Sequence, residues 1–316
     1  MDDLLAYVER PSQYLGNELN AVKKDLAHVD LTVGLAYPDL YEIGMSNTGL
    51  HILYHMLNEN PEVSAERVYL PAEDMIALLE RDKRPMTTLE NRIPLADLDV
   101  LGIQIPHELS YANIVKTLRL GQIPIWTKDR GREAPLILGG GPGAFGPEVV
   151  APFYDAILLG DGEEAFWKIL EVVKSWRDDP AEQPRSALHQ ALARVTGVYV
   201  PALYEFDYHE DGRVAAVRSL HPDAPEMVFK AVLDDLETAF YPDTAIVPYS
   251  TTVHDRLGVE VMRGCTVGCR FCQAGMVYRP LRERSPKKIL DLAKCGLGAT
   301  GFEDVSLLSL DTGDYT

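Results

Sequence analysis

Three cysteines lie close together in the last fifth of the chain. Cys265, Cys269 and Cys272 are spaced C-x3-C-x2-C, directly after an apolar run that predicts a strand. The chain has only four cysteines, and their crowding is typical of an intracellular metal or redox site rather than of a disulfide framework. A short loop of this kind can point three thiolates at one cuboidal cluster and leave a fourth iron without a protein ligand. The spacing therefore predicts a [4Fe-4S] cluster with an open iron.

The residues around the cysteines agree with this interpretation. Phe271 precedes the third cysteine, where an aromatic ring can shield a cluster, and Gly264 and Gly268 permit the tight turns that the loop needs. Between His254 and Lys288 there are eight Lys and Arg but three Asp and Glu. This local positive charge would lower the pKa of the thiols and attract a carboxylate or an anionic substrate.

A zinc site is the alternative, with Cys295 or His254 as the fourth ligand, and it would make the chain a zinc-stabilised binding protein. Zinc sites usually pair their ligands as two C-x2-C units, and no second pair exists here. Cys295 stands alone on an apolar helix face, where we expect it to belong to the core.

Short apolar strands alternate with helical patterns from residue 30 onward. This alternation predicts an α/β fold with a doubly wound parallel sheet, whose ligands bind beyond the carboxyl ends of the strands. The expected strands are 31–36, 66–70, 99–105, 136–139 and 156–160, and the expected helices are centred on 50–57, 74–80, 111–118 and 163–176.

Four regions follow from these patterns. An N-terminal extension covers residues 1–29, and the doubly wound domain covers 30–176. Residues 177–250 form a polar linker and a β-hairpin bridge around Asp211-Gly212, a dipeptide typical of hairpin turns. Residues 251–316 form one βαβ unit, with strands at 258–262 and 304–310 and a helix from 286 to about 295.

The cysteine loop and its surroundings, VHDRLGVEVMRGCTVGCRFCQAGMVYRPLRERSP followed by VSLLSLDTGDY, closely resemble the radical-SAM superfamily. In particular they resemble an uncharacterised group with an N-terminal cobalamin-binding-like domain, and YPDLYEIGMSNTGLHILYHMLN, HELSYAN and the GDGEE segment resemble that group too. The resemblance implies S-adenosylmethionine as a cofactor, bound and reductively cleaved at the cluster, and a flavodoxin or ferredoxin as the electron donor. It implies that Ser309, Asp311 and Gly313 meet the methionine moiety, although the family usually has Ser at position 311. No catalytic residue and no substrate are assigned.

Cobalamin-binding domains carry D-x-H-x-x-G after their first strand. The resembling stretch here runs from Asp39 to Gly44 and has Tyr41 in place of the histidine, so it excludes imidazole coordination through that position. Gly139 and Gly140, after the fourth strand, resemble the family's second signature, which borders the nucleotide tail of cobalamin. A domain that kept this fold without the cofactor is the alternative, since fold does not fix function. The GDGEE segment predicts only a turn that opens a helix.

Bulk properties limit the remaining possibilities. The net charge of −18 argues against broad nucleic-acid binding, and no apolar run is long enough to span a membrane, so a cytoplasmic protein is expected. Only 44 residues follow Cys272, whereas a radical-SAM barrel of about six βα units needs ~180. The expected unit is therefore the start of an incomplete (β/α) barrel, in a fragment that is inactive alone or that a second chain completes. Its strand at 305–310 would expose an unpaired edge.

Overall fold

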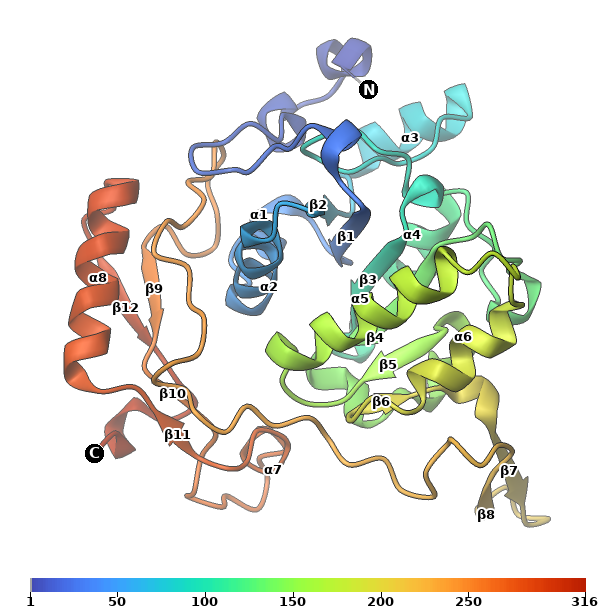
Figure 1. Ribbon diagram of the computed structural model, residues 1–316. Coiled ribbons are helices and arrows are strands. Elements are labelled where there is room, and N and C mark those ends of the chain that lie inside the picture. The colour runs from blue at the N-terminus through green and yellow to red at the C-terminus, as the bar shows by residue number, and fades with distance from the viewer. Residues whose placement is uncertain (1) are drawn as a thin grey trace.

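The computed structural model describes residues 2–316 and is built around a six-stranded sheet (Figure 1). The strands lie in the order β2-β1-β3-β4-β5-β6. Strands β1 to β5 are parallel, and β6 pairs antiparallel with β5 at one edge. Their bounds are β1 Leu31–Tyr37, β2 Val63–Tyr69, β3 Val100–Gln104, β4 Leu136–Gly140, β5 Ala156–Leu158 and β6 Val198–Tyr199.

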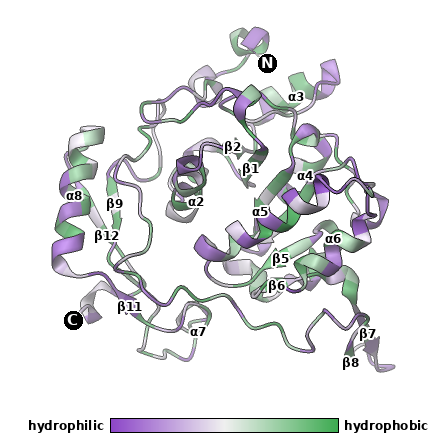
Figure 2. Cartoon of the chain, in the orientation of Figure 1, coloured by the Kyte–Doolittle hydropathy of each residue, from purple (hydrophilic) through white to green (hydrophobic). Residues whose placement is uncertain are grey.

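Helices cover both faces of this sheet. Helices α2 (Thr48–Glu59), α5 (Glu163–Arg177) and α6 (Arg185–Leu192) pack on one face and contribute to one core cluster. Helices α3 (Glu73–Asp82) and α4 (Tyr111–Leu120) pack on the other face and contribute to a second cluster. In Figure 2 these helices carry both hydrophobic and hydrophilic residues, as expected for elements with one buried face. The predicted doubly wound parallel sheet is therefore confirmed.

The sheet continues past residue 176, where the sequence predicted its end. Helix α6 buries Leu188 and Leu192 in the same core as α5, and β6 pairs with β5 through Val198 and Tyr199. A two-residue strand at a sheet edge is too short to show a period in the sequence. The predicted linker thus contains the last strand of the sheet.

The predicted hairpin is present between this sheet and the C-terminal unit. Strands β7 (Tyr204–Tyr208) and β8 (Val214–Ser219) pair antiparallel with each other around the Asp211-Gly212 turn. Figure 1 shows the hairpin extending away from the body of the molecule.

The C-terminal unit contains the predicted strand-helix-strand arrangement. Strand β9 (Leu257–Glu260) pairs in parallel with β12 (Val305–Leu308), and helix α8 (Pro286–Thr300) connects them and packs on β9. The three clustered cysteines, Cys265, Cys269 and Cys272, lie in a long excursion between β9 and α8. This excursion includes β10 (Met262–Arg263), the short helix α7 (Ala274–Val277) and β11 (Arg282–Glu283). That this unit begins a barrel stays a prediction. Among the described residues, no helix is both long and apolar enough to cross a membrane.

The N-terminal segment joins the two parts of the molecule. Leu4 and Tyr14, from two short 3-10 helices (Asp2–Tyr7 and Pro11–Tyr14), are buried in the core beside α3. The Asn20 side chain donates to the carbonyls of Ala245 and Ala299, which belong to the C-terminal part of the chain. Residues 2–29 are therefore part of the packed structure.

Candidate functional site

A cavity of about 350 Å³ lies at the carboxyl ends of the parallel strands. This is where ligands bind in doubly wound folds. Leucine and isoleucine side chains from β1, β3, β4, β5 and α2 make much of its wall, and Asn47 and Gln104 add amide groups. Three residues of the C-terminal unit, Glu260, Arg263 and Tyr278, also line it. The cavity therefore lies between the sheet and the part of the chain that carries the cysteines.

The glycine run at the carboxyl end of β4 forms one edge of this cavity. Gly139 and Gly140 both line it. A Cβ on Gly139 would lie 3.0 Å from the Tyr154 ring, and the following Gly141 has a φ of +99°, so the chain needs glycine here for close packing and for the turn. The two glycines expected to border a cofactor thus lie at the cavity.

The three residues expected from the D-x-H-x-x-G resemblance do not line the cavity. Asp39 accepts from the amide of Leu40, and Tyr41 is buried. A Cβ on Gly44 would lie 2.3 Å from the ring of Tyr69, so glycine allows helix α1 (Tyr41–Gly44) to pack tightly on that ring. Packing within the domain accounts for Tyr41 and Gly44.

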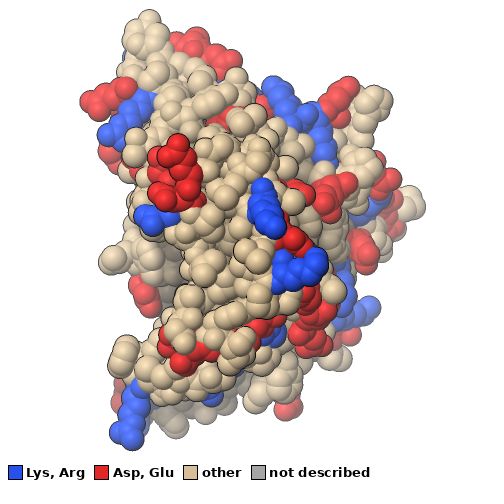
Figure 3. All heavy atoms as spheres, turned by 90° about the vertical axis from the view of Figure 1, so that its left-hand side faces the viewer, with Lys and Arg blue, Asp and Glu red and all other residues tan. Residues whose placement is uncertain are grey.

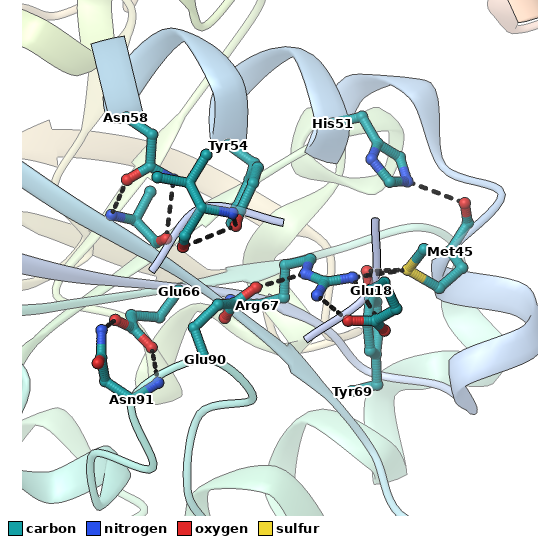
Figure 4. A network of polar contacts seen from close by, with 12 residues as sticks. Glu18, Met45, His51, Tyr54, Asn58, Glu66, Arg67, Tyr69, Glu90 and Asn91 are labelled. Atoms are coloured by element: carbon teal, nitrogen blue, oxygen red, sulfur yellow. Dashed lines mark hydrogen bonds and ion pairs between the residues drawn. The ribbon is translucent and has the colours of Figure 1, made fainter. Parts of the chain in front are cut away.

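Figure 4 shows a buried polar network centred on Arg67 of β2, and Tyr41 bonds to Glu18, one of its members. The Tyr41 hydroxyl donates to Glu18 at 2.8 Å, and the Arg67 guanidinium pairs with Glu18 at 2.6 Å and with Glu90 at 2.5 Å. Arg67, Glu18 and Glu90 have fully buried side chains. Burial raises the pKa of Glu90 despite the neighbouring Arg67. This network could not be predicted from the sequence, because its members come from distant segments.

The cysteine loop is closed at its base by the antiparallel pair β10 and β11. Gly264 and Gly268 have φ values of +94° and +73°, which confirms that the loop uses glycine for its turns. All three thiols are free, with Cys269 exposed and Cys265 and Cys272 partly buried. Within residues 2–316, no three metal-ligating side chains gather around a common point. Three cysteine thiols are suitable ligands for an iron-sulfur cluster, but in this structure they do not converge on one point.

Phe271 does not shield the cysteines here. Its side chain is 91 % exposed and so makes little contact with the loop. Cys295 is also exposed, on α8, so the expectation that it belongs to the core is wrong. The buried residues of α8 are Leu292 and Gly296.

Ser309, Asp311 and Gly313 follow β12. Because β12 runs parallel to β9, these residues lie beyond the same edge of the small sheet as the start of the cysteine excursion. The Ser309 and Thr312 hydroxyls are 2.6 Å apart, and Asp311 accepts from the amide of Gly313 at 3.2 Å. The topology therefore brings two of the predicted site segments to one edge.

Three of the arginines near the cysteines are paired with acids and do not contribute to a free basic surface. Arg263, Arg282 and Arg284 are engaged with three carboxylates, those of Asp161, Glu163 and Glu260. Figure 3, which faces the C-terminal unit, shows acidic and basic side chains interspersed among uncharged ones. The charges of these three arginines are thus balanced by the carboxylates that they meet in the fold.

The paired groups have shifted pKa values. Burial opposes ionisation of Asp161, but the charges of Arg263 and Arg282 outweigh it and lower the pKa of this carboxyl. Burial alone would lower the pKa of Arg263, whereas Glu260 and Glu163 raise it above its usual range. Asp161 and Glu163 belong to the GDGEE segment, for which the sequence predicted only a helix-opening turn. The sequence signal that could have predicted these ion pairs is the acidic GDGEE segment, whose charge is opposite to that of the later cluster of arginines.

Comparisons with known proteins agree with this architecture. The family model for radical SAM proteins, N-terminal, matches residues 49–201. An uncharacterised protein of Methanocaldococcus jannaschii is 24% identical over 288 residues, which are 90% of this chain and 50% of that protein. The anaerobic magnesium-protoporphyrin IX monomethyl ester cyclase of Cereibacter sphaeroides is 27% identical over 146 residues, 45% of this chain and 19% of the cyclase.

Among solved structures, the radical S-adenosylmethionine methyltransferase TsrM from Kitasatospora setae, with cobalamin and a [4Fe-4S] cluster bound, has a similar fold. The TM-score is 0.51 at 14% identity, over 89% of this chain and 49% of that one. The chain is therefore similar to radical SAM proteins over residues 49–201, and its fold is similar to that of a radical SAM methyltransferase with cobalamin and a [4Fe-4S] cluster bound. It spans about half the length or less of the relatives it matches.

Proposed function

We propose that this chain carries the iron-sulfur and S-adenosylmethionine site of a radical-SAM enzyme, next to a crevice for cobalamin. The observation that carries the proposal is the place of the C-x3-C-x2-C loop. It follows the first strand of a βαβ unit, and Ser309 to Gly313 follow the second strand at the same edge. In parallel α/β folds, residues at such an edge converge on one ligand.

In this proposal Cys265, Cys269 and Cys272 hold the cluster, and Ser309, Asp311 and Gly313 contact the methionine moiety. When bound, the cluster would supply an open iron that chelates S-adenosylmethionine and an electron for its reductive cleavage. The role of the protein is to hold the three thiolates, to orient S-adenosylmethionine and to limit the access of water. The substrate is not assigned, and an electron donor and a further chain remain expected partners.

The crevice suits part of a cobalamin molecule rather than the whole. The cavity of about 350 Å³ is largely apolar and is bordered by Gly139 and Gly140, where the resembling family places the nucleotide tail. Tyr41 is turned into the core toward Glu18, so the loop that begins at Asp39 offers no side-chain ligand from this position. Cobalamin would therefore bind here without imidazole coordination through residue 41.

Anaerobic reconstitution with iron and sulfide tests the cluster. The chain is expected to turn brown, with a broad absorption shoulder and about four irons per chain. Changing Cys265, Cys269 and Cys272 together to alanine should abolish iron binding, whereas Cys295→Ala, the matched control on α8, should leave the iron content unchanged. A colourless protein with one zinc would contradict the proposal and favour a zinc-stabilised binding protein.

A titration with hydroxocobalamin tests the crevice. Binding should shift the visible absorption of the corrin, and Gly140→Val, which adds a branched side chain at the cavity edge, should weaken it by roughly tenfold or more. The ideal Cβ at Gly140 meets only the Leu158 carbonyl, at 3.7 Å, so the fold should tolerate the change. Gly298→Ala on α8, where a Cβ meets nothing within 4 Å, is the control. If Gly140→Val and Gly298→Ala bind hydroxocobalamin equally, the proposal that cobalamin binds in this crevice is contradicted.

A further inference from the structure

The base of the cysteine loop carries two arginines that face each other. In the β10–β11 ladder Arg263 is the partner of Arg282, and the loop of residues 264–281 lies between them. Like charges directly opposite each other in a ladder destabilise the pair unless an anion lies between them. The loop that carries Cys265, Cys269 and Cys272 therefore needs an acid at its base.

Asp161 supplies that acid from the other part of the molecule. Its Oδ1 accepts from Nη1 of Arg263 at 2.9 Å, and its Oδ2 accepts from Nη1 of Arg282 at 2.5 Å. Oδ2 also accepts from the amide of Leu233 at 2.9 Å. The Asp161 carboxylate, whose side chain is 13 % exposed, thus bridges both arginines of the ladder pair. Glu163 and Glu260 also pair with Arg263, at 2.8 and 3.0 Å.

The backbone around Asp161 is itself tightly fixed. Asp161 follows β5 at the carboxyl end of the sheet and lines the cavity. The preceding Gly160 has a φ of +97°, and a Cβ there would lie 2.0 Å from the Ala231 carbonyl oxygen. The Asp161 amide donates to that same carbonyl at 2.9 Å. The carboxylate is therefore presented from a segment that has little freedom to move.

The backbone on the cysteine-loop side of the contact between Asp161 and Arg263 is tightly packed too. Gly264, between Arg263 and Cys265, would place a Cβ 2.5 Å from the Pro280 carbonyl oxygen and 2.8 Å from that of Tyr278. The backbone therefore passes from the arginine to the first cysteine in close contact with the returning strand of the loop. A displacement of Arg263 would be transmitted to Cys265.

We propose that Asp161 is a positioning residue that anchors the base of the cysteine loop to the carboxyl ends of the sheet, so that the loop keeps a fixed place relative to the cavity. The anchor stands on the contacts above, whereas the roles of the loop and the cavity as cluster and cofactor sites rest on the proposed function.

Hydrogen exchange on the full chain, without added iron, tests the anchor. Asp161→Asn keeps the size and a carbonyl acceptor for Leu233 but removes the charge. Amides in residues 264–281 should exchange about tenfold faster or more, since a buried charge-assisted hydrogen bond is lost, while β1, β3 and β4 keep their protection. The matched control is Glu164→Gln, which changes an exposed acid in the first turn of α5 and should leave the exchange unchanged.

Two results of this experiment would overturn the anchor. One is unchanged exchange in residues 264–281, and the other is equal acceleration throughout the chain, which would make Asp161 a general stabilising residue. If Asp161→Asn does not fold, Glu163→Gln removes one contact of Arg263 and should give a smaller increase confined to the same loop. No local increase in Glu163→Gln would then count against the anchor.

The electron paramagnetic resonance signal of the reduced, reconstituted protein gives a second readout. Asp161→Asn should bind as much iron as the unchanged chain but give a shifted or broadened signal, whereas Glu164→Gln should not. An unaltered signal in Asp161→Asn would contradict the positioning role. If no variant binds iron, the proposed function fails while the exchange result still decides the anchor.

Discussion

At the scale of single residues, Arg67 is a buried cation held by two buried carboxylates. It also donates to the sulfur of Met45 at 3.1 Å, and its own amide donates to Glu90 at 2.7 Å. Such a group is stable only while every partner is present, because a buried charge without a counter-charge loses its hydration and gains no ion pair that offsets this loss.

Arg67→Met should therefore lower the free energy of unfolding by about 3–5 kcal/mol, since it leaves Glu18 and Glu90 buried without a cation. Urea unfolding at neutral pH measures this. The matched control is Arg81→Met, which breaks an exposed pair with Asp82 and should cost little stability, because solvent screens that pair. Similar losses in the two variants would contradict the assigned role of the network.

Two buried histidines on α2 predict a dependence of stability on pH. Nε2 of His51 donates to the Met45 carbonyl at 2.9 Å, whereas Nδ1 of His51 and Nε2 of His55 are buried with no hydrogen-bond partner within residues 2–316. Burial lowers the pKa of His51 to about 4 and that of His55 to about 3. Both imidazoles are therefore neutral in the folded chain.

The unfolded chain binds these protons at a pKa near 6.5, so stability is complete above that pH and falls as the pH drops toward 4 and 3. Between pH 7 and pH 5 each histidine should cost about 2 kcal/mol of unfolding free energy. His55→Leu should flatten this slope in denaturation experiments at stepped pH, and the exposed His28→Leu should not. An unchanged slope in His55→Leu would contradict the prediction.

At the scale of elements, the hairpin β7–β8 and helix α6 differ although both follow the predicted domain boundary. The hairpin residues are mostly exposed and pair only with each other, whereas α6 buries Leu188 and Leu192 against the sheet. An isolated two-stranded ribbon adds little stability.

Replacing residues 206–217 by an Asn-Gly turn should change the free energy of unfolding by less than about 1 kcal/mol. Leu192→Ala in α6 is the comparison and should cost about 2–5 kcal/mol, because it opens a cavity in the core. Denaturant unfolding of both variants measures the difference. A loss above 2 kcal/mol for the shortened hairpin would mean that the ribbon supports the sheet.

At the scale of the whole molecule, two sets of contacts, here called seams, hold the C-terminal unit against the sheet domain. One is formed by Asp161 and Glu163 with Arg263 and Arg282, beside the cavity. The other is formed by the N-terminal segment, which pairs Leu19 with Val247 and bonds Asn20 to Ala245 and Ala299. The cavity lies beside the first seam, so the geometry of any ligand site there depends on both parts.

The sequence by itself determined the alternation of strands and helices, the hairpin turn and the cysteine loop. Each is encoded within a short window, by side-chain period, by glycine or by fixed spacing. Only the tertiary structure decided that Asp161 meets Arg263, that Tyr41 turns toward Glu18, that Cys295 is exposed and that β6 completes the sheet. These depend on contacts between residues far apart in the chain, and the local pattern of a sequence does not specify which distant charges and faces will meet.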